Sequence, residues 1–323
     1  MTDLNQQAAD NAAKIMAAPT YAGDESGPLD RLKLVGLDYS DLSQPDYRKL
    51  FMRGCMEEDS AYNSLIQTTD IFEWRNVKTW VRRLLEAGVL TGVKNDAKGF
   101  DVSNQHILNM SGDLLEMHAK AAEIGAVFTK ARYPFTVQAS DAALQNAARQ
   151  LAIFTRMSLD QGLVQFVEPE LVRDSLGGSH GIGESYSMMD KMIGYLMEAL
   201  EEWEIPPECV ILKTNMIEPG ANDEGDPDHI AERTVTLFKK YKRNFAGFKL
   251  LSGGQSTELA LRRVEAIVSH SKAEAPDMVG KISTSFSRAG MGGVLEAYAS
   301  KGKKAAIAKF VENSLAIERA LAA

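Results

Sequence analysis

The chain has 323 residues, of which 45% are hydrophobic and 25% are charged, which is typical of a globular protein able to bury a sizeable core. Its formal net charge of -8 argues against general nucleic-acid binding, because such binding needs a basic face. No apolar stretch approaches the roughly 20 residues that span a bilayer, and the N-terminal residues lack the pattern of a signal peptide. We therefore expect a cytoplasmic protein without a membrane partner.

The first part of the chain contains helical patterns and short apolar runs. We expect helices over residues 4–16, 45–57 and 77–87, because apolar side chains recur there at helical spacing. Short runs at 64–71 and 89–94 favour strands.

The rest of the chain alternates more regularly between strand and helix. Helices are predicted over residues 103–124, 228–242 and 257–270, after Ser140, along the methionine-rich stretch from 188 to 203, and towards the C-terminus. Strands are predicted over residues 126–133, 163–167, 210–216, 247–251 and 281–286.

Polar residues follow the ends of the predicted strands at intervals of about one βα unit: Asp24, Lys94, Lys130, Glu168, Lys213, Ser252 and Arg288. The longer first interval contains the strand expected at 64–71, which gives eight units. Eight such units close into a TIM barrel, whose C-terminal rim gathers strand ends into one site. We therefore predict an α/β fold: a single (β/α)8 barrel domain over residues 1–323, with an extra N-terminal helix and C-terminal helices. The alternative, an open doubly wound sheet, would favour a Gly-x-Gly-x-x-Gly fingerprint, which this sequence lacks.

Lys213 ends a short apolar run that is bounded by prolines. Such a run is typical of a buried strand, and lysine is almost never fully buried unless it is paired. One interpretation is that the side chain reaches solvent or pairs with a carboxylate. The other is an uncharged amine that attacks a carbonyl and forms a Schiff base.

The predicted rim favours the second interpretation. If the barrel closes, Lys213 faces further charged residues: Lys130, Lys94, Glu168, Glu170 and Asp24. A second ammonium disfavours a charge on a neighbouring amine, and carboxylates can move the protons that Schiff-base chemistry requires. Glu168 and Glu170 are two residues apart, so they share one face of a strand.

Two places in the sequence suit phosphate. The segment Ser252-Gly253-Gly254 ends a strand and precedes a helix, where backbone N–H groups can approach an anion, although a tight turn capped by Ser256 explains it equally well. Arg288 follows one βα unit later and favours phosphate. A second candidate site, Ser26 with Arg31, would suit a substrate that is phosphorylated at both ends.

Six motifs resemble, in order, those of class I fructose-bisphosphate aldolases, over about residues 20 to 290. They are Gly-Asp-Glu-Ser at 23–26, Gly-Val-Lys at 92–94, Phe-Thr-Lys-Ala-Arg at 128–132, the run ending Val-Glu-Pro-Glu at 162–170, Leu-Lys-Thr-Asn-Met at the start of 212–220, and Leu-Ser-Gly-Gly-Gln-Ser at 251–256.

The resemblance implies a carbon–carbon lyase of glycolysis and gluconeogenesis. It would reversibly cleave fructose 1,6-bisphosphate into dihydroxyacetone phosphate and glyceraldehyde 3-phosphate, without a metal or another cofactor. By motif, Lys213 matches the Schiff-base lysine and Glu168 the carboxylate that moves protons. Glu170, Asp24 and Lys130 match residues that tune the lysine and orient substrate hydroxyls.

The resemblance also implies substrate-binding residues. One phosphate would contact Ser252, Gly253, Gly254 and Arg288, the other would lie at or beside Ser26, Arg31 and Lys94, and Arg132 would also bind substrate. We expect sugar phosphates as the only ligands and a homo-oligomer as the assembly.

Three departures from the family pattern stand out. Better-known members end in a tyrosine that assists proton transfer, whereas this sequence ends in alanine, so another group is expected to serve. Asp30 replaces the lysine of a lysine–arginine pair, so the second phosphate would bind more weakly or use Lys33. The segment 95–98 carries an extra residue, which leaves Asp96 and Lys98 without a role.

Two other functional classes fit the sequence less well. A metal-dependent aldolase needs histidine ligands, but the histidines are scattered without a metal-binding spacing, and only His180 lies in a glycine-rich loop. The two cysteines, Cys55 and Cys209, likewise match no metal or disulfide framework. A barrel that binds sugar phosphates or a partner protein without turnover is the third class, and the full set of charged rim residues argues against it.

Overall fold

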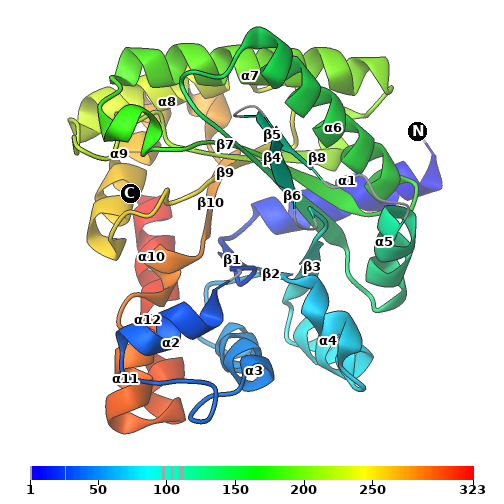
Figure 1. Cartoon of the computed structure of the whole chain (residues 1–323), viewed down its shortest axis with the longest axis vertical. Helices are drawn as coiled ribbons and strands as arrows, with labels where there is room; N and C mark the ends of the chain where they lie inside the picture. The colour runs from blue at the N-terminus through cyan, green and yellow to red at the C-terminus, as the bar shows by residue number, and fades with distance from the viewer. Residues whose placement is uncertain (1, 26, 97–98, 103–104, 109–112) are drawn as a thin grey trace.

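The structure is a computed structural model that describes all residues except 1, 26, 97–98, 103–104 and 109–112. In this described part, eight parallel strands close a barrel in the order β1-β10-β9-β8-β7-β6-β3-β2, with helices around it (Figure 1). The predicted (β/α)8 barrel is therefore confirmed. Its strands are β1 (Thr20–Ala22), β2 (Ser64–Gln67), β3 (Leu90–Lys94), β6 (Phe128–Phe135), β7 (Val164–Leu171), β8 (Val210–Thr214), β9 (Gly247–Leu250) and β10 (Ile282–Phe286).

The helices follow the expected alternation. They are α1 (Asp3–Met16), α2 (Pro28–Leu34), α3 (Gln44–Cys55), α4 (Val77–Glu86), α5 (Asp113–Glu123), α6 (Asp141–Leu159), α7 (Ile182–Glu202), α8 (Pro227–Tyr241), α9 (Thr257–Glu274), α10 (Arg288–Met291), α11 (Val294–Lys301) and α12 (Lys303–Ala322). Single 3-10 turns lie at η1 (Thr69–Glu73), η2 (Ser175–Gly178), η3 (Pro207–Cys209) and η4 (Pro276–Met278). None of the described helices is long and apolar enough to cross a membrane.

Several predicted elements have other bounds in the structure: the strands expected over 64–71 and 210–216 end at Gln67 and Thr214. In the described part of 103–124, where a helix is expected, α5 covers Asp113–Glu123, and β5 (Gln105–Ile107) pairs antiparallel with β4 (Phe100–Val102). The alternation of Phe100 and Val102 with a polar residue is the period of a strand, and helical periodicity begins only later. The strand expected over 163–167 continues to Leu171, so Glu168 and Glu170 lie within β7.

Helix α1 covers the end of the barrel where the strands begin. Its apolar residues Ala8, Ala12 and Ile15 are fully buried, and it packs against β7, β8 and β9. Lys249 of β9 donates from the barrel interior to the carbonyl oxygens of Ile15 at 2.9 Å and of Ala18 at 2.5 Å. The last carbonyl groups of a helix have no partner within the helix, so Lys249 satisfies part of the α1 C-terminus. The opposite end of the barrel is left for the candidate site.

Candidate active site

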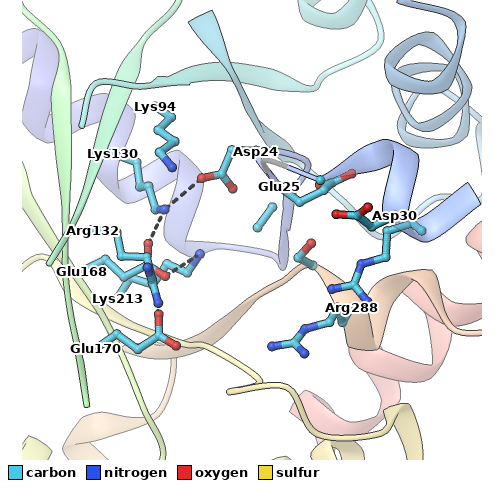
Figure 2. A pocket seen from close by; sticks show the side chains of 14 residues that line it. Asp24, Glu25, Asp30, Lys94, Lys130, Arg132, Glu168, Glu170, Lys213 and Arg288 are labelled. Atoms are coloured by element: carbon cyan, nitrogen blue, oxygen red, sulfur yellow. Dashed lines mark hydrogen bonds and ion pairs between the residues drawn. The ribbon is translucent and has the colours of Figure 1, made fainter. Parts of the chain in front are cut away.

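A cavity of about 510 Å³ lies among the residues that the sequence placed at the strand ends. Its lining residues come from β1, β3, β6, β7 and β8, from helix α2 and the loop before it, and from the start of α10 (Figure 2). The structure brings together nine of the thirteen predicted site residues at this cavity: Asp24, Lys130, Glu168, Glu170, Lys213, Lys94, Arg132, Arg288 and Arg31.

Lys213 is held at the cavity by a strand that is otherwise apolar. The three residues before it, Val210, Ile211 and Leu212, are completely buried, which fixes β8 in the barrel wall. Lys213 itself is only 3% exposed, and its Nζ lies 3.2 Å from Oε1 of Glu168. The structure thus shows the lysine inside the barrel and paired with a carboxylate, as in the first of the two interpretations, at a cavity large enough for a small molecule.

Four charged residues form a continuous chain of alternating sign from β1 to β8. Nζ of Lys130 lies 2.8 Å from Oδ2 of Asp24 and 2.5 Å from Oε2 of Glu168. The other oxygen of Glu168 contacts Lys213, so one carboxylate bridges two lysines (Figure 2). All four side chains are buried, which removes water from between them and strengthens their interactions.

The chain of charges shifts the pKa values of its members. Burial would raise the pKa of Asp24, but Lys130, Lys213 and Lys94 outweigh it and hold that pKa well below its usual value. Burial would lower the pKa of Lys130, but Asp24 and Glu168 hold it well above its usual value. The pKa of Glu168 is lowered, because Lys130 and Lys213 outweigh its burial. At neutral pH, Asp24 and Lys130 therefore form a fixed ion pair beside Glu168.

A second pair of charges lies beside this chain. Glu170 forms an ion pair with Nε of Arg132, and the backbone N–H of Arg132 donates to Oδ2 of Asp96 at 3.0 Å. Oδ1 of Asp96 lies 3.7 Å from Nζ of Lys94. Asp96, to which the sequence assigned no role, thus joins β3 to β6 at the cavity edge. Lys98 lies outside the described residues.

The residues predicted to bind phosphate divide into two groups. Arg288 and Arg31 line the cavity, and Figure 2 shows Arg288 across the pocket from Lys94 and Lys130. The segment Ser252-Gly253-Gly254 does not line the described cavity, but it lies behind Arg288. A Cβ atom on Gly254, whose φ is +84°, would come within 2.7 Å of Nη2 of Arg288, so a larger residue here would displace the guanidinium. Ser26 lies outside the described residues, and Lys33 does not line the cavity.

Several residues that build the site are not among those predicted from the sequence to act there. Glu25, Asp30 and Ser287 also line the cavity. Arg48 of α3 donates to the backbone oxygens of Gly23 at 2.6 Å and of Glu25 at 3.0 Å, and so holds the segment that carries Asp24. Arg48 sits in an ordinary helical pattern, so nothing in the sequence links it to a segment more than twenty residues away.

The histidines lie elsewhere. His118 is buried and bonded to Leu114 and Asn95, and His180 contacts the carbonyl of Ser175. None of the five histidines lines the cavity. In the described residues, no group of three or more histidine, cysteine, aspartate or glutamate side chains is arranged to hold a metal ion.

A family model for class-I fructose-bisphosphate aldolase matches residues 9–322. The chain belongs to this family. The predicted family resemblance is therefore confirmed, and with it an aldolase, which is a lyase. Fructose-bisphosphate aldolase 3 of Arabidopsis thaliana, a chloroplastic protein, is 28% identical over 94% of this chain and 81% of its own length. A cytosolic aldolase of the same plant is 31% identical over 59% of this chain and 54% of its own length.

The fold of this family member is also that of solved aldolases. The structure of fructose-bisphosphate aldolase from Plasmodium falciparum, in complex with TRAP and a small-molecule inhibitor, superimposes with a TM-score of 0.88. The match covers 99% of this chain and 95% of that protein at 21% sequence identity, which shows the shared fold.

Proposed function

We propose that the protein cleaves fructose 1,6-bisphosphate reversibly into dihydroxyacetone phosphate and glyceraldehyde 3-phosphate, through a Schiff base on Lys213. The observation that carries this proposal is the buried contact of 3.2 Å between Nζ of Lys213 and Glu168 at a cavity of about 510 Å³. Family membership supports the aldol chemistry, and the acidic and basic groups around Lys213 are those that such chemistry requires.

In the proposed reaction, the Lys213 amine attacks the ketone carbon of the open-chain sugar. Glu168 accepts a proton from the attacking nitrogen and passes it to the alkoxide oxygen, which gives a carbinolamine. A second proton, taken up from solvent, lets the hydroxyl group leave as water and produces an iminium ion. The iminium then accepts the electron pair of the broken C–C bond, while a carboxylate removes the proton from the adjacent hydroxyl. The aldehyde leaves, the enamine takes up a proton, and water releases the second triose phosphate.

The other charged residues are assigned to binding and orientation. The Asp24–Lys130 pair and Glu170 would orient the hydroxyl groups of the sugar, because they line the same cavity as Lys213. Arg288, with Ser252, Gly253 and Gly254 behind it, would bind one phosphate. Arg31, Lys94 and Arg132, together with Ser26, would bind or lie beside the other.

Borohydride trapping tests the proposal directly. Reduction in the presence of dihydroxyacetone phosphate should attach the triose covalently to the peptide that carries Lys213, as seen by mass spectrometry. Lys249, also a buried lysine, is the internal control and should stay unlabelled. Labelling that is absent from Lys213 would contradict the Schiff-base mechanism. Cleavage activity that disappears on treatment with a chelator would instead indicate a metal-dependent aldolase.

The remaining assignments rest on the family and the composition. We propose a role in glycolysis and gluconeogenesis, a cytoplasmic location, one domain and a homo-oligomeric assembly, with sugar phosphates as the ligands. Cell fractionation tests the location, and light scattering coupled to gel filtration tests the assembly. A monomer, or a protein recovered only from an organelle, would contradict the respective assignment.

A further inference from the structure

A further buried carboxylate, Glu218, lies next to the loop 252–256 and does not line the cavity. It follows Lys213 in the segment between β8 and α8 and is only 3% exposed. Its oxygens accept hydrogen bonds from Nε2 of Gln255 at 3.1 and 3.0 Å. Nε of Arg173 lies 3.1 Å from Oε2, and Arg263 of α9 donates to the same oxygen. Glu218 thus joins three distant segments.

The loop that Glu218 contacts is the one that backs Arg288. Gln255 belongs to it, and its backbone N–H donates to the carbonyl of Ser252 at 2.9 Å. Gly253 has a φ of +52°, and a Cβ atom there would meet Oε1 of Glu218 at 3.1 Å. Gly254, the next residue, lies against Arg288. Glu218 and Arg288 therefore lie beside consecutive residues of the loop, and Glu218 is bonded to the loop through Gln255.

The charged groups that face Glu218 are two arginines. Arg173 comes from the segment after β7 and Arg263 from α9, and the second guanidinium also donates to the backbone carbonyl of Glu224. The side chain of Glu224 is exposed. Burial raises the pKa of Glu218 to about 7, although both arginines act in the opposite direction. The charge on Glu218 therefore changes near neutral pH.

We propose that Glu218 is a positioning residue that sets the affinity of the active site for phosphorylated substrates, by fixing the loop 252–256 against Arg288. This inference rests on the proposed function, because the loop is there assigned to a substrate phosphate. Ionised Glu218 can accept from Gln255 and both arginines at once. A protonated carboxyl has fewer lone pairs to offer, so the loop loses part of its anchor.

Two substrates separate positioning of the phosphate loop from general damage. Borohydride labelling of Lys213 is measured against the concentration of dihydroxyacetone phosphate and of dihydroxyacetone, which lacks the phosphate. In Glu218→Gln, the concentration of dihydroxyacetone phosphate for half-labelling should rise about tenfold, as expected when charge-assisted hydrogen bonds are weakened. The value for dihydroxyacetone should be unchanged.

The pH profile is the second readout. Half-labelling of the wild-type protein by dihydroxyacetone phosphate should need less ligand as the pH rises through about 7, where Glu218 ionises. In Glu218→Gln this part of the profile should be lost. The second ionisation of the phosphate itself affects both proteins equally, so their ratio removes it. Glu224→Gln, which changes an exposed carboxylate near Arg263, is the matched control and should follow the wild type.

Gln255→Met is the second variant, because Glu218→Gln leaves two buried guanidinium groups without their carboxylate and could fail to fold. It removes only the amide link and should raise the half-labelling concentration of dihydroxyacetone phosphate alone, by about threefold. Equal changes for both ligands, or none for either, would overturn the inference and leave the proposed function standing. A wild-type protein that is not labelled at all would overturn the proposed function, and this inference with it.

Discussion

Two buried lysines on neighbouring strands of the same barrel have entirely different surroundings. Lys213 of β8 and Lys249 of β9 are register partners, and both side chains are buried. Nζ of Lys213 lies beside the Glu168 carboxylate at the cavity. Nζ of Lys249 contacts the neutral oxygens of Ile15 and Ala18 at the covered end, and Oγ of Ser283 at 3.1 Å. Both residues are buried lysines, so the groups that contact each Nζ determine whether the lysine has a catalytic or a structural role.

Replacement of each lysine by methionine should give the largest contrast in activity. Lys213→Met removes the proposed nucleophile, so kcat for fructose 1,6-bisphosphate cleavage should fall on the order of 10⁵-fold. Lys249→Met should keep kcat within about threefold, because the side chain does not line the cavity. Steady-state kinetics on folded protein measures both. Comparable losses of kcat in the two variants would contradict the different roles assigned to Lys213 and Lys249.

Glu168, the carboxylate that contacts Lys213 but not Lys249, can be tested next. Glu168→Gln keeps the shape of the side chain but removes its ability to accept and return a proton. We expect kcat to fall by about 10²- to 10⁴-fold, with a much smaller change in KM. Glu184→Gln is the control, because Glu184 only caps the N-terminus of α7 at the surface. If KM rises and kcat is retained, Glu168 binds substrate and does not move protons.

The structural role assigned to Lys249 predicts a loss of stability. Lys249→Met leaves the carbonyl groups of Ile15 and Ala18 without this donor, so the free energy of unfolding should fall by about 1–3 kcal/mol. Lys239 donates to the carbonyl of Glu274 at 2.9 Å from the protein surface. Lys239→Met is therefore the matched control, with an expected change below about 0.5 kcal/mol in urea unfolding. Equal costs would mean that burial of the contact is irrelevant.

The pH dependence of this stability is a further test. Burial lowers the pKa of Lys249 well below its ordinary value of 10.5. Between the lowered pKa and 10.5, the unfolded chain binds more protons than the folded chain, so stability rises with pH. The free energy of unfolding of the wild type should therefore increase relative to Lys249→Met between about pH 7 and pH 9. A difference that shrinks with pH would contradict the assigned burial effect.

Much of the fold and part of the site could be predicted from the sequence, because they depend on local patterns. Strand-end residues such as Lys213 and Glu168 are found by the spacing of βα units, since a closed barrel brings all strand ends to one rim. The antiparallel pairing of β4 with β5 is not predicted from the sequence, because short strands give a weak signal. Lys249 lies within the strand predicted over 247–251, and nothing in the local sequence shows which oxygens its side chain contacts.

Contacts between distant segments account for the rest. The links of Arg48 to the Asp24 segment and of Glu218 to Gln255 join residues that lie more than twenty positions apart. Each of these residues is ordinary in its own neighbourhood, and its role depends on how the helices pack around the barrel. No periodicity or motif carries that information.

The position of Asp24 links formation of the active site to closure of the barrel. Asp24 follows β1, which pairs with β2 on one side and with β10, at the far end of the sequence, on the other. Its ion pair with Lys130 joins β1 to β6, which are not neighbouring strands of the barrel. β1 is fixed only when both of its neighbours are present. Contacts so remote in sequence form slowly. During refolding, aldolase activity should accordingly return later than the circular dichroism signal of the helices, when β1 pairs with β10.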